Sequence, residues 1–85
     1  MYINIGGTVI PGSGIIGIFD LDNTTVSVKT REFLQRAEKE NRIEYTGSEI
    51  PVSFILCREN DGREKIYLSP VSAKILKKRF ETPDL

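Results

Sequence analysis

The sequence predicts an α+β fold, in which a small antiparallel β-sheet carries two helices, one mid-chain and one C-terminal. Apolar and polar residues alternate on both sides of an Asp-Gly pair at 61–62, a pattern typical of a β-hairpin. Apolar residues recur at helical spacing in two other segments, 30–41 and 73–80. With 85 residues and no internal repeat or linker, the chain is expected to form a single domain, residues 1–85.

The composition narrows the classes of protein to consider. Twelve basic and twelve acidic residues cancel, so a nucleic acid would have to meet a local basic patch. Histidine is absent, which removes the commonest zinc ligand and acid–base group, and the single cysteine, Cys57, forms no internal disulfide. We expect no cofactor and no metal. Without a secretion signal or an apolar run of about 18 residues, we expect a soluble cytoplasmic protein that makes no membrane contact.

The N-terminal residues predict a hairpin followed by a break. Tyr2–Ile5 and Thr8–Ile10 read as short strands separated by two glycines. Pro11–Gly14 then interrupts the chain. A glycine-rich loop of this kind cradles phosphate when a helix follows it, and here a strand follows. We therefore interpret this segment as a chain reversal.

The most apolar stretch, residues 15–21, reads as a strand. Both of its faces carry apolar side chains, with Ile15, Phe19 and Leu21 on one and Ile16 and Ile18 on the other. Such a strand lies inside a sheet or beneath a partner subunit, not at a solvated edge. So much apolar surface on one strand of a small chain predicts a homo-oligomer.

Asp20, Asp22 and Thr24 close this stretch and resemble the first motif of the haloacid-dehalogenase phosphatases, an aliphatic strand ending in Asp-x-Asp-x-Thr. The resemblance implies a nucleophilic Asp20, an acid–base Asp22 and bound magnesium. That fold needs a parallel sheet, whose crossovers each take a dozen or more residues, and only 64 of the 85 residues follow Leu21. No later acidic pair completes a metal site. We therefore interpret the stretch as a strand ending in a turn and keep the phosphatase as a remote alternative.

A helix is predicted over 30–41, with Thr30 as its N-cap. Phe33, Leu34 and Ala37 form its narrow apolar stripe. Oppositely charged residues four apart, such as Glu38 and Arg42, mark the outer face as solvated. A short strand at 43–45 follows.

The clearest hairpin pairs residues 52–58 with 64–68 through the turn at 60–62. Cys57 alternates with the apolar residues of the first strand. We interpret it as a small, unreactive core residue, because the chain has no histidine to activate the thiol.

The last predicted helix is capped by Ser72. Its apolar face carries Ala73, Leu76 and Phe80, and its basic residues are Lys74, Lys77 and Lys78 on the far side, with Arg79 at the seam between the two faces. Two interpretations stay open for this basic face. It is a solvated surface that complements the helix dipole, or it is a patch that meets an anion such as DNA.

Five short segments recur in the same order in a family of bacterial proteins: residues 1–3, 17–20, 32–34, 66–70 and 76–79. In order and spacing they resemble the YaaB/RemB proteins, relatives of RemA, the regulator of extracellular-matrix genes. The similarity spans nearly the whole chain. It implies a small cytoplasmic, non-enzymatic α+β protein that forms homo-oligomers. In the RemA branch these are ring-like, bind DNA through exposed arginines and activate the transcription of biofilm genes.

The sequence departs from the RemA branch at the arginines that contact DNA. Their positions align with Gly14, Ser48 and Glu49, so no DNA contact is carried over from them. The remaining DNA-binding candidates are the basic residues of the last helix: Lys74, Lys77, Lys78 and Arg79. We expect a RemB-like regulatory oligomer that contacts DNA through this helix. The alternative is a structural or adaptor oligomer that binds no DNA.

Overall fold

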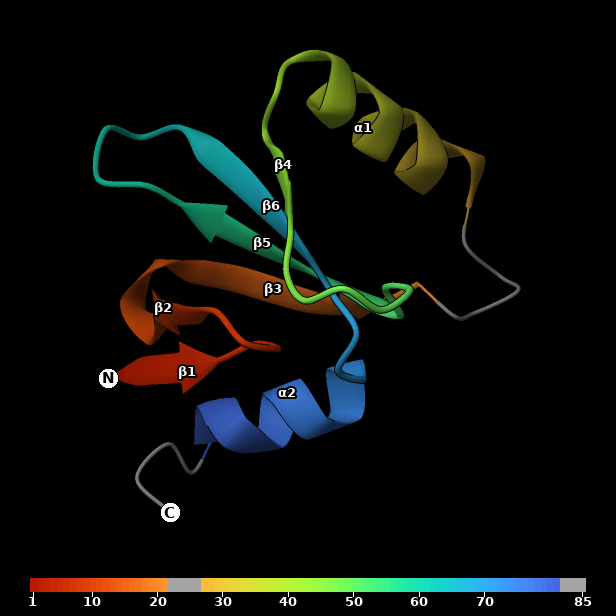
Figure 1. The fold of residues 1–85 in the computed structure, drawn as a ribbon. Helices are drawn as coiled ribbons and strands as arrows, with labels where there is room; N and C mark the ends of the chain where they lie inside the picture. Colours follow the sequence, from red (N-terminus) through yellow and green to blue (C-terminus); the bar gives the residue numbers. More distant parts are fainter. Residues whose placement is uncertain (22–26, 82–85) are drawn as a thin grey trace.

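The computed structural model describes residues 1–21 and 27–81 and confirms the α+β class (Figure 1). Within these residues, a two-stranded sheet and a four-stranded sheet accompany two helices. The elements in chain order are β1 (Tyr2–Asn4), β2 (Val9–Pro11), the 3₁₀ turn η1 (Gly12–Gly14), β3 (Ile15–Asp20), α1 (Val28–Lys39), β4 (Ile43–Tyr45), β5 (Ser53–Arg58), β6 (Glu64–Ser69) and α2 (Ala73–Glu81).

The four-stranded sheet has the strand order β3-β5-β6-β4 and mixes both kinds of pairing. β5 pairs antiparallel with β6, as the predicted hairpin requires, and also with β3, but β4 pairs parallel with β6. The parallel pair has a topological cause. β4 and β5 run in opposite directions on either side of β6, so β6 must be parallel to one of them. The prediction of an antiparallel sheet is wrong for β4, because it rests on hairpins, which pair only neighbours in sequence.

Both predicted hairpins are present. Between β5 and β6, the Glu59 amide donates to Arg63 O at 2.7 Å, and Gly62 adopts a φ of 86°. Between β1 and β2, the Asn4 carboxamide oxygen accepts hydrogen bonds of 2.9 Å from the amides of Gly6 and Gly7. These glycines have φ values of 121° and 102°, which L side chains rarely adopt.

Two hydrophobic clusters lie on opposite faces of the four-stranded sheet. Figure 1 shows α1 on one side of the sheet and the β1–β2 hairpin with α2 on the other. The hairpin and α2 share a buried cluster with β5, made of Ile3, Ile5, Ile10, Ile55, Cys57 and Leu76. The other buried cluster, next to α1, consists of Ala37, Phe54, Ile66 and Leu68.

A β-bulge changes which residues of β3 share a face. The register against β5 shifts between Ile15 and Gly17, so Ile16 is an extra residue on this strand. Ile15 therefore packs with Ile18 against the first cluster. Our prediction that Ile15 shares a face with Phe19 is wrong, because strict alternation is interrupted at the bulge.

The two helices begin at side-chain caps. The Ser72 hydroxyl accepts from the Ile75 amide at 3.2 Å, which confirms Ser72 as the cap of α2. The predicted cap of α1 is wrong. Ser27 fills that role, and its hydroxyl accepts from the Thr30 amide at 3.1 Å. Thr30 lies in the first turn, where amides still need an external acceptor.

The end of α1 also differs from the prediction. The helix stops at Lys39, and Asn41 adopts a φ of 59°, a left-handed conformation typical of the residue that ends a helix. Arg42 is thereby turned out of the helical spacing. It pairs with Glu40 at 2.8 Å rather than with Glu38, the partner expected for a continuous helix.

Buried hydroxyl groups join the N-terminal hairpin to the larger sheet. Thr46 Oγ1 donates to Ile5 O at 3.2 Å and to Leu68 O at 3.1 Å. Ser69 Oγ also donates to Ile5 O and accepts from the Val71 amide at 3.0 Å. Thr46 and Ser69 are both buried. Each hydroxyl satisfies backbone groups that water cannot reach, so these bonds fix the hairpin against the ends of β4 and β6.

Candidate functional site

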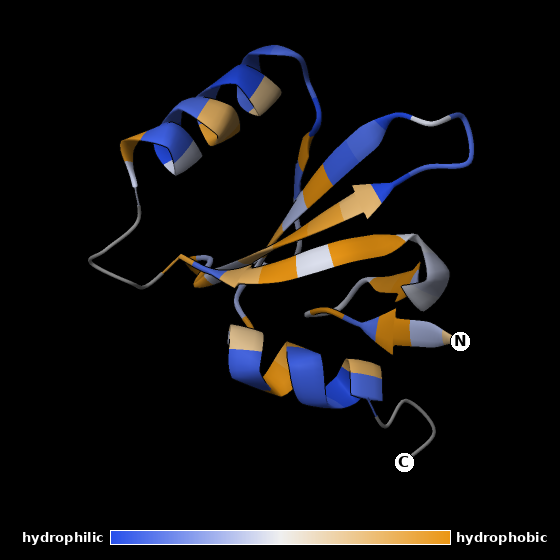
Figure 2. Cartoon of the chain, turned by 180° about the vertical axis from the view of Figure 1, so that it is seen from behind, coloured by the Kyte–Doolittle hydropathy of each residue, from blue (hydrophilic) through white to orange (hydrophobic). Residues whose placement is uncertain are grey.

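The exposed edge of β3 is the first candidate. β3 pairs only with β5 among the described strands and so forms one edge of the four-stranded sheet. In Figure 2 it is a nearly continuous apolar strand at the border of that sheet. The sequence predicts that this strand lies inside a sheet or beneath a partner subunit. The first option is wrong, because β5 and β6 lie between two neighbours and β3 lies at the edge.

The apolar side chains of β3 are incompletely covered by the chain itself. Ile16 is 51% exposed and Phe19 is 44% exposed. The Phe19 ring stacks on Phe54 with a centroid distance of 4.8 Å and also lies over Gly17. A Cβ atom at Gly17 would come within 2.6 Å of that ring. Gly17 therefore provides the space for the ring, as a glycine within a strand often does for a close neighbour.

The backbone of β3 presents alternate residues to solvent. Residues of an antiparallel strand alternate between those whose N–H and C=O face the partner strand and those whose groups face away. The Leu21 amide donates to Val52 O at 2.8 Å, which orients Leu21 toward β5. By alternation Phe19 and Gly17 also face β5, and the N–H and C=O of Ile18 point away from it.

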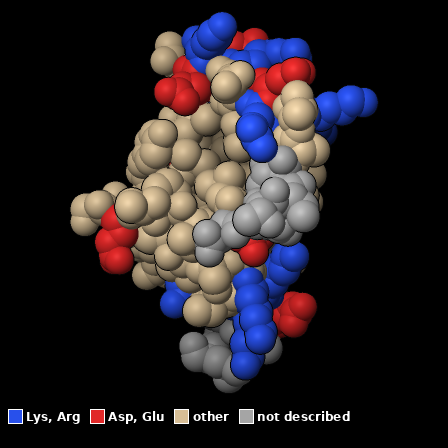
Figure 3. Space-filling view, turned by 90° about the vertical axis from the view of Figure 1, so that its right-hand side faces the viewer, with Lys and Arg blue, Asp and Glu red and all other residues tan. Residues whose placement is uncertain are grey.

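The basic face of α2 is the second candidate. Lys74, Lys77 and Lys78 are exposed, and the helix brings them to one side, as predicted. Arg79 lies at the seam, where its Nη1 donates to Asn4 O at 2.9 Å. Figure 3 shows charged groups gathered near the top and bottom of the molecule, at the heights of α1 and α2 in Figure 1, with mainly uncharged surface between them.

The predicted apolar face of α2 is only partly enclosed. Ala73 and Leu76 are buried, while Phe80 stays exposed near the end of the helix. Ile75, on the solvent side, is exposed as well. The helix thus packs through its first turns, and its basic C-terminal half extends along the N-terminal hairpin.

The phosphatase motif lies in a different setting from the one its resemblance implies. Asp20 is exposed at the end of β3, whose neighbour β5 is antiparallel. Asp22 and Thr24 lie outside the described residues. Across residues 1–21 and 27–81, no three His, Cys, Asp or Glu side chains are placed to hold a metal ion together.

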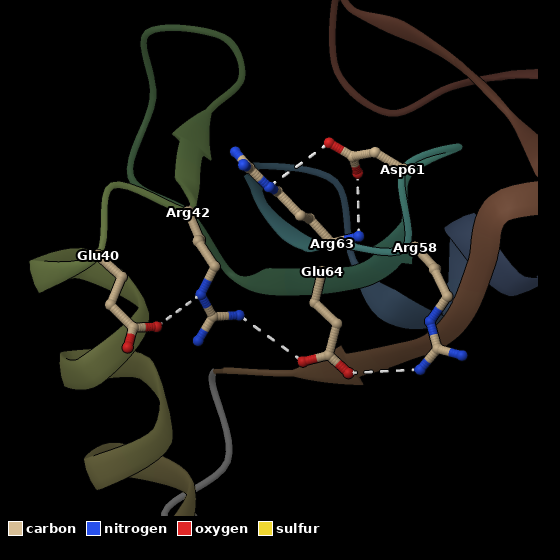
Figure 4. Close-up of polar contacts among 6 residues, drawn as sticks. All are labelled: Glu40, Arg42, Arg58, Asp61, Arg63 and Glu64. Carbon is tan, nitrogen blue, oxygen red and sulfur yellow. Dashed lines mark hydrogen bonds and ion pairs between the residues drawn. The ribbon is translucent and has the colours of Figure 1, made fainter.

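A charged network that was not predicted from the sequence joins the end of α1 to the β5–β6 hairpin (Figure 4). Arg42 lies between Glu40 and Glu64, at 2.8 Å and 3.7 Å, and Glu64 also lies 3.7 Å from Arg58. Beside them a depression of about 530 Å³ is lined mainly by charged side chains of both signs. Because neighbouring charges of opposite sign offset one another here, this surface presents little net charge to a ligand.

The parallel pairing of β4 with β6 also creates an ion pair that was not predicted from the sequence. Lys65 Nζ lies 2.8 Å from Glu44 Oε1 and 5.2 Å from the centre of the Tyr67 ring. The hydrogen bond that Lys65 donates to the Glu44 carboxylate raises the pKa of Lys65 above its usual value. Residues 44 and 65 could be recognised as neighbours only after the strand order was known.

Cys57 behaves as the sequence predicted. Its side chain is buried in the cluster beneath the N-terminal hairpin. Burial, assisted by the charge of Glu59, raises the pKa of the thiol from 9.0 to about 11. Almost no thiolate exists near neutral pH, so Cys57 is not a nucleophile.

No family model matches this chain, and no curated protein or solved structure is significantly similar to it. Neither described helix is both long and apolar enough to cross a membrane. The two surfaces described above, the edge of β3 and the basic face of α2, are therefore the candidate sites of function.

Proposed function

We propose that this chain is a non-enzymatic, self-assembling regulatory protein of the cytoplasm, similar to the RemA and RemB regulators of extracellular-matrix genes. The observation that carries the proposal is the uncovered edge of β3, where Ile16 and Phe19 are about half exposed. Soluble proteins usually shorten, charge or cover such an edge. An apolar edge kept open is best explained by a second subunit that covers it.

The size of the chain supports assembly. A domain this small buries little more than about 60% of the surface of its unfolded chain, so a partner subunit adds substantially to its core. Both faces of the sheet are already occupied in part, by α1 on one side and by the hairpin with α2 on the other. The edge is the direction in which the sheet can still grow.

DNA contact through α2 is the second part of the proposal, and the exposed arc of Lys74, Lys77 and Lys78 supports it. Lysines on a helix supply charge to phosphates but discriminate little between bases. The hydrogen bond from Arg79 to Asn4 holds the helix against the hairpin and so fixes how this arc is presented. In an oligomer the arc would be repeated on every subunit, which compensates for the small number of charges on each.

The experiment combines solution mass with a DNA titration. At micromolar concentration we expect the mass of two or more subunits, and a duplex should bind less tightly as salt increases. Changing Lys74, Lys77 and Lys78 to glutamate should remove binding, because each lost phosphate contact lowers the salt slope by about 0.9. The matched control changes Lys29, Arg31 and Lys39 on α1, which alters the net charge equally and should leave most of the binding.

The possible outcomes distinguish three classes of protein. An oligomer without salt-sensitive DNA binding would be the structural or adaptor protein, and only the DNA part of the proposal would fail. A monomer at micromolar concentration would contradict the proposed function itself. Magnesium-dependent phosphatase activity that Asp20→Asn abolishes would establish the remaining alternative instead.

A further inference from the structure

We propose that two copies of the chain pair antiparallel through β3, with the two-fold axis passing at Ile18, so that their four-stranded sheets continue into one. This inference rests on the proposed self-assembly and specifies its surface and symmetry. A two-fold contact uses the same surface on both subunits and closes at two copies. A larger ring would then have to join such dimers through another surface.

The backbone of β3 is oriented for this pairing. The Leu21–Val52 hydrogen bond fixes the alternation, which leaves the N–H and C=O of Ile18 directed away from β5. Two Ile18 residues on a two-fold axis can therefore exchange both hydrogen bonds. Their Cα atoms would then lie about 5.5 Å apart. The pairing uses the regular part of β3 beyond the bulge at Ile16 and leaves the hydrogen bonds to β5 intact.

The side chains select Ile18 as the residue on the axis. With the axis there, Gly17 lies directly opposite Phe19 of the partner subunit. Gly17 has no side chain to obstruct the approaching strand, and the Phe19 ring of the same subunit already covers it. An axis at Gly17 would instead set two glycines directly opposite each other and pair Ile18 with the bulged Ile16 of the partner subunit.

Charge supports the same register. Asp20 is the only charged residue of β3. An axis at Asp20 would place two carboxylates directly opposite each other, which is unfavourable. With the axis at Ile18, the two Asp20 residues lie four positions apart, about 13 Å along the strands. The pairing therefore joins two apolar edges without opposing like charges.

The other edge of the sheet is less suited to pairing. β4 has three residues against six in β3. Its central residue is Glu44, which pairs with Lys65 at 2.8 Å. A short, charged edge strand is a common means of preventing strand addition. The open edge of this sheet is therefore β3.

The first test follows amide hydrogen exchange of the unmodified protein at several concentrations. The Ile18 amide should exchange about tenfold more slowly once dimers form, because pairing protects it from solvent. The neighbouring Phe19 amide faces β5 and should be protected at every concentration, so it is the internal control. If the solution mass shows an oligomer while Ile18 exchange does not change with concentration, the β3 pairing is wrong although self-assembly stands.

The second test uses cysteine cross-linking. Under mild oxidation Ile18→Cys should give mainly covalent dimers, since a Cα separation of about 5.5 Å suits a disulfide. Val9→Cys and Glu44→Cys are the controls on other exposed strands, and wild-type Cys57 is buried. Cross-linking of Ile18→Cys no greater than that of Val9→Cys would overturn the proposal. A monomeric mass for wild type would instead contradict the proposed function and this inference together.

Discussion

The two edges of the four-stranded sheet are built in opposite ways. β4 is short, and its end is closed by the chain itself, since Glu44 pairs with Lys65 and Thr46 bonds to two backbone carbonyls. β3 is twice as long and leaves Ile16 and Phe19 about half exposed. Polar contacts thus complete one edge within the subunit, whereas the other edge keeps apolar side chains exposed.

The largest loss of stability is expected when the buried hydroxyl groups at the end of β4 are removed. Replacing Ser69 by alanine and Thr46 by valine removes the hydroxyl groups that bond Ile5 O, Leu68 O and the Val71 amide. Ile5 O and the Val71 amide then lose these partners, whereas Leu68 O keeps its bond from the Thr46 amide, so the free energy of unfolding should fall by about 3 kcal/mol. Urea denaturation measures this change. The control Ser13→Ala changes an exposed serine and should alter the free energy of unfolding little. An equal loss in the control and in the double variant would show that the buried hydroxyls do not close this edge.

A somewhat smaller loss of stability is expected when Cys57, which lies opposite Ile15 of β3, ionises at high pH. Burial raises its pKa to about 11 in the folded chain, so the unfolded thiol loses its proton first as the pH rises. Stability should therefore decrease between about pH 9 and pH 11, by up to about 2 kcal/mol. Urea denaturation of wild type and Cys57→Ala across this range isolates the thiol. Parallel pH profiles for the two proteins would show that Cys57 is not protected by the core.

A substitution on the open edge, β3, should weaken the association of subunits rather than the stability of the folded subunit. Ile16→Asp places a charge on an edge residue that is 51% exposed, so the folded subunit should tolerate it. The association constant should fall by at least about tenfold, because the new carboxylate would lie opposite Asp20 of the partner subunit in the proposed pairing. Val9→Asp makes the same change at a residue of β2 that is 58% exposed. Should both variants assemble equally well in sedimentation, β3 would not be the contact.

The smallest effect is expected at the Glu44–Lys65 pair. The hydrogen bond raises the pKa of Lys65 in the folded chain, so its contribution to stability is complete below the unfolded pKa and is lost as the pH rises through the folded value. An NMR titration of Lys65 should give a higher pKa in wild type than in Glu44→Gln. The same pKa in both proteins would show that this pair does not hold the β4 edge in solution.

Local signals in the sequence predicted most elements of the fold. The Asp61–Gly62 turn and the Ser72 cap depend on residues within a few positions, and both are found. Ser27 and Thr30 are both suitable caps one turn apart, so the local pattern did not separate them. The wrong choice moved the start of α1 by less than one turn.

Non-local features could not be predicted in this way. The parallel pairing of β4 with β6 brings together segments about twenty residues apart, and no local pattern specifies it. The bulge at Ile16 is an irregularity in pairing with β5, so it cannot be recognised from alternation alone. Gly17 was a usable signal, because a glycine inside an apolar strand often marks a bulge or a close contact. The candidate basic face of α2 was predicted fully, since it depends only on helical spacing.

We propose that the exposed edge of β3 joins one subunit to another. Sedimentation equilibrium of the wild-type chain beside Ile16→Asp, over the same range of concentrations, tests this contact. We predict the mass of at least two subunits for wild type at micromolar concentration and a lower mass for Ile16→Asp at the same concentration. Equal masses for the two proteins would contradict the proposed contact.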